Sequence, residues 1–67
     1  MKIIHRAIRL KHYNSSIEMW SKVAEKIGIK IEVFHRGETN YLFYVEVEVA
    51  IFCEGDAEKI TEFENII

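Results

Sequence analysis

The chain has 67 residues, 49% of them hydrophobic, and a net charge of −2, which indicates one small domain, 1–67, without an overall basic attraction for nucleic acid. Its only cysteine, Cys53, excludes an internal disulfide and a four-cysteine zinc site. Because no apolar run is long enough for a signal peptide or a membrane span, we expect a cytoplasmic protein, in its own cell or in a host cell, that does not enter a membrane.

A first strand is predicted over residues 2–10. Even-numbered positions place the larger aliphatic side chains on one face, which we expect to contact the core: Ile4, Ile8 and Leu10. The charge at this end of the chain is one-sided, since residues 1–12 contain no acid and four cations: Lys2, Arg6, Arg9 and Lys11. Residues 54–64 carry five acids and a single cation, Lys59, and we interpret the two segments as solvated faces of opposite sign that can matter for association.

A helix is predicted over residues 16–27. Ser15 and Glu18 fit the S-x-x-E capping box, and Gly28 stands where a left-handed residue ends a helix. Apolar residues recur at helical spacing along one side: Ile17, Trp20, Ala24 and Ile27. We therefore expect Trp20 to pack against a sheet.

Two strands follow, over residues 29–36 and 41–53, and the sequence Gly-Glu-Thr-Asn predicts a turn at 37–40. In both strands the odd-numbered side chains form the apolar set expected to face the core. For the second strand this set includes Tyr41 and Phe43.

The hairpin register is constrained by this numbering. Directly opposed residues share a face of the sheet, so the numbers of two paired residues must add to an even value. A three-residue loop meets this condition, and a five-residue loop does so only by setting two glutamates opposite each other. The three-residue loop pairs Lys30 with Glu46 and Phe34 with Leu42.

A second helix is predicted from about Ala57, with Asp56 as its cap. Its apolar stripe has three members: Ile60, Phe63 and Ile67. The element order is β-α-β-β-α, which predicts an α+β fold of ferredoxin-like type without the last strand. A right-handed crossover would place the first and third strands side by side in a three-stranded, antiparallel-containing sheet, with both helices on one face.

No catalytic, cofactor-binding or metal-binding residue is predicted. His5, His12 and His35 lack any ligand spacing, and Cys53 is interpreted as a packed thiol rather than a nucleophile. We therefore expect a protein that is not an enzyme and that uses no cofactor.

A partner-binding surface is predicted from apolar side chains that fall outside the helix-covered core, together with one arginine: Phe34, Leu42, Tyr44, Phe52 and Arg9. Without a fourth strand, the first strand is also an open edge that another chain can pair with. These features favour a non-enzymatic protein-interaction module, a small regulator or inhibitor that binds a larger protein or forms a homodimer. A phage-type inhibitor of a host defence complex is one concrete version.

Two alternatives stay open. Ferredoxin-like dimers can hold small ligands between their subunits, so a ligand sensor is one of them. The other is binding of single-stranded RNA or DNA, with Phe34, Tyr44 and Phe52 stacking on bases. Nucleic acid is the less favoured partner because three glutamates on that face would repel phosphate: Glu32, Glu46 and Glu48.

Overall fold

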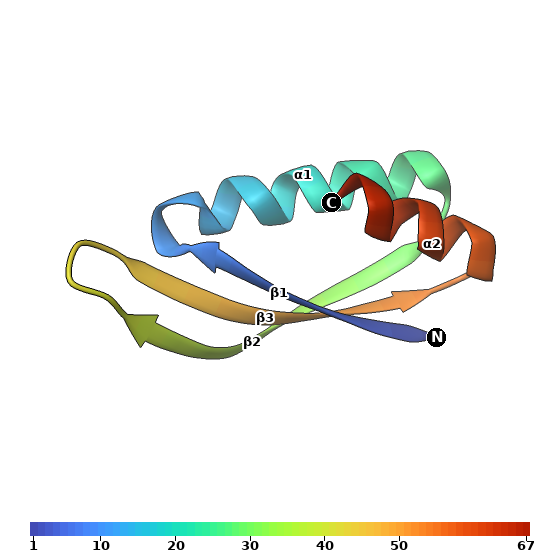
Figure 1. Ribbon diagram of the computed structural model, residues 1–67. Helices are drawn as coiled ribbons and strands as arrows, with labels where there is room; N and C mark the ends of the chain where they lie inside the picture. Colours follow the sequence, from blue (N-terminus) through green and yellow to red (C-terminus); the bar gives the residue numbers. More distant parts are fainter.

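The computed structural model describes residues 1–67 as a three-stranded antiparallel sheet with two helices over one of its faces (Figure 1). The elements in chain order are β1 (Lys2–Arg9), a 3-10 turn (Leu10–His12), α1 (Tyr13–Ile27), β2 (Lys30–Asn40), β3 (Val45–Glu54) and α2 (Ala57–Ile66). β3 is the central strand, with β1 and β2 at the two edges. The α+β class and the neighbouring positions of β1 and β3 agree with the prediction, and the element order is consistent with the predicted ferredoxin-like plan.

β1 presents the predicted face to the core. Ile4 is buried and Ile8 packs against the core, while Ile3 on the other face is exposed. Leu10 is an exception to the prediction: the strand ends at Arg9, so Leu10 lies in the 3-10 turn and is half exposed. The alternation of faces stops where the backbone leaves the extended conformation.

α1 begins three residues earlier than predicted, and the capping box at Ser15 is wrong. The 3-10 turn leads directly into the helix at Tyr13, so Ser15 lies inside the first turn. Its hydroxyl donates a hydrogen bond to the His12 carbonyl at 3.1 Å. The predicted end of the helix is confirmed, because Gly28 has φ 95° and donates its N–H to the Ala24 carbonyl at 2.9 Å.

The predicted hairpin loop and register are wrong. β2 continues through the predicted turn to Asn40, and the loop is formed by residues 41–44. Lys30 pairs with Glu54 rather than Glu46, and Phe34 pairs with Ala50 rather than Leu42.

The even-sum rule itself holds in the part of the hairpin that contacts the core, where Val33 pairs with Ile51. A bulge between His35 and Gly37 leaves Arg36 without a partner. Because of this extra residue, a four-residue loop still pairs odd-numbered residues of β2 with odd-numbered residues of β3 on the core side of the bulge. Because the strand does not start until Val45, Tyr41 and Phe43 are exposed instead of buried, contrary to the prediction.

The core lies between β3 and the two helices. Asp56 caps α2 as predicted, with its Oδ1 accepting the Glu58 N–H at 2.9 Å. The side chains that fill the core are apolar throughout: Ile4, Trp20, Ala24, Ile29, Val47, Val49, Ile51, Cys53, Ile60 and Phe63. The helices do not cover the whole length of the sheet, so the β2–β3 loop projects beyond the start of α1 (Figure 1).

Candidate protein-interaction site

The five predicted binding residues lie in two groups. Phe34 and Phe52 contact each other on the open face of the sheet, which is the face turned away from the helices, with ring centroids 4.9 Å apart in an edge-to-face arrangement. Arg9, Leu42 and Tyr44 lie at the hairpin end of the molecule.

The open face is divided into an apolar half and a charged half. Cross-strand neighbours from β1, β3 and β2 form its rows, and the two rows with aromatic side chains, away from the hairpin loop, are Ile3–Phe52–Glu32 and His5–Ala50–Phe34, with the Lys30–Glu54 pair beyond them. Ile3 and Phe34 remain 44% and 45% exposed, so this half offers apolar contact area. The two rows nearer the loop carry a glutamate in the middle: Ala7–Glu48–Gly37 and Arg9–Glu46–Thr39.

The hairpin loop, residues 41–44, forms an apolar tip. Leu42 and Phe43 at its apex are 88% and 91% exposed. At its base the rings of Tyr41 and Tyr44 stack with centroids 4.8 Å apart, and the Tyr41 N–H donates to the Tyr44 carbonyl at 2.8 Å. The base of the tip is therefore ordered, while its apex meets solvent.

β1 ends beside this tip. The Arg9 guanidinium carbon lies 4.3 Å from the centroid of the Tyr44 ring, within the range of a cation–π contact. A depression of about 310 Å³ joins the two segments, and its lining comes from both: Arg9, Leu10, Lys11, Phe43, Tyr44 and Val45. Leu10, Tyr41 and Phe43, all three predicted to face the core, are instead exposed at this end of the molecule.

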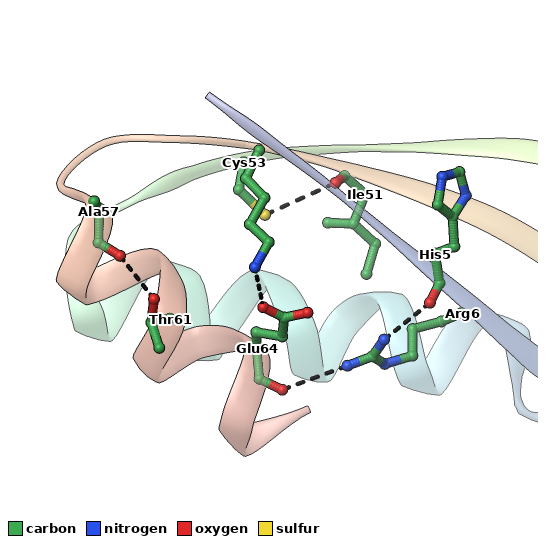
Figure 2. Close-up of polar contacts among 8 residues, drawn as sticks. His5, Arg6, Ile51, Cys53, Ala57, Thr61 and Glu64 are labelled. Carbon is green, nitrogen blue, oxygen red and sulfur yellow. Dashed lines mark hydrogen bonds and ion pairs between the residues drawn. The ribbon is translucent and has the colours of Figure 1, made fainter.

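The helix side of β1 is tied to the last turn of α2. Lys2 forms an ion pair with the Glu64 carboxylate. Figure 2 shows the Arg6 guanidinium between two carbonyls, donating to that of His5 at 2.9 Å and to that of Glu64 at 3.4 Å. Arg6, Arg9 and Lys11 have no carboxylate within 4.0 Å, so Lys2 is the only cation of this segment in an ion pair.

The residues with potential chemistry do not converge. No group of three or more histidine, cysteine, aspartate or glutamate side chains is placed to hold a metal ion. His35 lies 3.7 Å from the Glu38 carboxylate, measured from Nε2 to Oε1, and forms no further ion pair.

Cys53 is completely buried, and its Sγ lies 3.8 Å from the Ile51 carbonyl oxygen (Figure 2). Burial raises the pKa of this thiol, and the nearby Glu64 carboxylate raises it further, while Lys2 offsets part of the effect. The sulfur is therefore held in its protonated form and away from solvent.

Neither helix combines the length and the apolar composition that crossing a membrane would require. The chain matches no protein-family profile, no curated protein and no solved structure.

Proposed function

We propose that this chain is a non-enzymatic protein-interaction module, a small regulator or inhibitor that binds a larger protein through the apolar tip. The observation that carries the proposal is the exposure of Leu42 and Phe43, at 88% and 91%, at the apex of an ordered loop. Contiguous exposed apolar groups mark interaction sites, and fully burying a Leu or Phe side chain contributes about 1.5–3 kcal/mol.

The base of the tip lowers the cost of binding. Association loses affinity when it must order mobile loops and side chains, so a loop held in one conformation binds more tightly. Here the Tyr41–Tyr44 stack, the hydrogen bond between the same residues and the Arg9 contact restrict the loop before any partner arrives. Leu42 and Phe43 then act as anchors for a pocket of the partner.

The partner must cover more than the tip. A specific interface usually buries about 1,000 Å² or more, and a Phe side chain with its neighbours supplies only part of that area. The additional surface is β1, which ends next to the tip, and, farther along the sheet, the apolar half of the open face, where Ile3 and Phe34 are exposed. This extent favours a larger protein over a short ligand.

The location and fold type belong to the same proposal. The order β1-β3-β2 supports a ferredoxin-like sheet without its last strand, in which the outer side of β1 stays unpaired. A single buried cysteine supports a reducing compartment such as the cytoplasm.

Site-specific photo-crosslinking in the native cells tests the proposal. p-Benzoylphenylalanine replaces Phe43 in one version of the full chain and Met19 in the matched control, because Met19 is an exposed apolar side chain on α1, 52% accessible, away from the tip. We expect a discrete protein adduct from position 43, larger than twice the chain mass, and none from position 19.

Four results contradict the proposal. Equal adducts at positions 43 and 19 would show non-specific contact. Adducts only with lipid would assign the tip to a membrane surface, and adducts only with nucleic acid would assign it to that polymer. An adduct of twice the chain mass, containing only this sequence, would show that the occupant is a second copy.

A further inference from the structure

We infer that the outer edge of β1 accepts an extended acidic segment of the partner as an added strand. This inference rests on the proposed function, because it assigns the chemistry of the protein that the apolar tip binds. Strand addition to an open sheet edge is a recurring mode of peptide recognition, in which main-chain hydrogen bonds supply the affinity.

β1 is the regular edge of this sheet. Its pairing with β3 runs without interruption from Lys2 opposite Cys53 to Arg9 opposite Glu46. β2, at the other edge, is interrupted by the bulge at Arg36. Bulges protect edges against added strands, whereas a long, even strand without proline is a template for them. The two edges therefore differ, and β1 is the one suited to pairing.

The charge on β1 selects an acidic strand. Residues 1–12 contain four cations and no acid, although the chain as a whole has more acidic than basic residues. Arg6, Arg9 and Lys11 lack a carboxylate partner, and the bonds of Arg6 go to backbone carbonyls instead. On its inner side β1 already pairs with an acidic strand, since Glu46 lies opposite Arg9. A second acidic strand on the outer side would meet the unpaired charges.

A second copy of β1 does not fit this edge. Two antiparallel copies that share one helix-covered face must pair residues of the same parity. One such register sets Lys2 opposite Arg6, another sets Arg6 opposite its own copy, and a third sets His5 opposite Arg9. In the remaining central register, His5 lies opposite His5 of the copy, and Arg6 lies diagonal to Lys2 of the copy. Cations lie directly opposite each other in the first two of these registers, and Arg6 lies diagonal to a cation of the copy in the other two, so the repulsion between cations disfavours pairing with a second copy.

The edge is also continuous with the apolar tip. The depression beside Arg9 and Leu10 reaches Phe43, so a segment lying along β1 arrives next to the tip. One partner can therefore occupy both surfaces, with an acidic strand on β1 and a pocket for Leu42 and Phe43.

Titration of the full, isotope-labelled chain with a capped eight-residue peptide of alternating valine and glutamate tests the inference. The matched control peptide alternates valine and lysine. We expect backbone amide signals of β1 to move on addition of the acidic peptide, with smaller changes along β2, and we expect the affinity to fall as salt is raised. Hydrogen exchange of amides in β1 should slow in the same complex.

Two double variants separate the charges of β1 and the following 3-10 turn from net charge. Arg6→Gln with Lys11→Gln should weaken binding of the acidic peptide about tenfold, corresponding to about 1.4 kcal/mol. Lys22→Gln with Lys26→Gln removes the same charge from the exposed side of α1 and should change the affinity less than twofold. Both variants keep the Arg9 contact with Tyr44.

The inference is overturned if the lysine peptide binds as tightly as the glutamate peptide, if neither binds, or if the moving signals centre on β2. A protein adduct at position 43 together with any of these results would leave the proposed function standing. The absence of that adduct, with a β1 response present, would overturn the proposed function alone.

Discussion

Arg9 holds its guanidinium carbon 4.3 Å from the centroid of the Tyr44 ring, which joins the end of β1 to the hairpin loop. Tyr44 in turn stacks on Tyr41, so a chain of three side chains fixes the base of the apolar tip. Both ends of the loop are thus held by side-chain contacts, in addition to the backbone hydrogen bond of the hairpin.

Removing this contact should loosen the tip. We expect Arg9→Ala to lower the free energy of unfolding by about 0.5–1 kcal/mol, as for an exposed cation–π pair, and to speed hydrogen exchange at the Tyr41 amide. Lys11→Ala, which removes a neighbouring cation without a ring contact, is the control. Unchanged Tyr41 exchange in the Arg9 variant would show that the hydrogen bond and stacking suffice.

Trp20 is the buried aromatic residue of α1, as the helical spacing predicts. Trp20→Ala should lower the free energy of unfolding by about 3–5 kcal/mol, because a large side chain is lost from a packed core. Urea unfolding followed by circular dichroism measures this without relying on the removed fluorophore. Met19→Ala, at an exposed neighbouring position, should cost about 0.5 kcal/mol or less. Equal losses in the two variants would contradict the packing of α1.

The buried thiol predicts a pH dependence at alkaline pH. The pKa of Cys53 is raised in the folded chain, so its contribution to stability is complete below the pKa of the unfolded thiol, about 8.5, and declines as the pH rises toward the folded value. Cys53→Ala lacks this titration. The difference in unfolding free energy between wild type and variant should be constant near neutral pH and fall above about pH 8.5.

A difference that stays constant through that alkaline range would show that Cys53 titrates alike in the folded and unfolded chains. Thiol labelling gives a second readout. The native protein should react slowly with a thiol reagent at neutral pH, and the urea-unfolded chain should react at once.

The sequence predicted the elements whose signals are local. Asp56 caps α2 and Gly28 ends α1 because short-range hydrogen bonds and a left-handed backbone position decide these sites. The hairpin loop was misplaced because the turn signal at 37–40 competes with four further cross-strand pairs, from Gly37 opposite Glu48 to Asn40 opposite Val45. The extra ladder bonds outweigh the local turn preference, and the bulge at Arg36 preserves the faces.

The candidate site was predicted in its residue types but not in its geometry. An odd or even residue number predicts which face of a strand a side chain lies on, but not where the strand begins. Phe43 was therefore predicted to lie in the core, whereas β3 begins at Val45 and Phe43 lies at the apex of the tip. The contact between Phe34 and Phe52 also depends on the register, since it is diagonal across the sheet, with Phe34 opposite Ala50. Long-range pairing decides both features.

The open face gives a prediction about the extent of the interface. Phe34 is 45% exposed and contacts Phe52, so Phe34→Ser should lower the affinity for the partner recovered at position 43 about tenfold, corresponding to about 1.4 kcal/mol. Ile66→Ser, at an exposed apolar position on α2, is the control. Equal affinities for the two variants would restrict the interface to the tip and β1.

The most direct measurement is the affinity of the Leu42→Ser, Phe43→Ser double variant for the protein that crosslinks at position 43. Both side chains are almost fully exposed in the free chain, so the variant should unfold at the wild-type temperature. Its dissociation constant, measured by isothermal titration calorimetry, should rise roughly 100-fold or more, because two anchors of about 1.5–3 kcal/mol each are lost. Met19→Ser should bind like wild type. A double variant that is folded and binds with unchanged affinity would contradict the assignment of the apolar tip as the binding site.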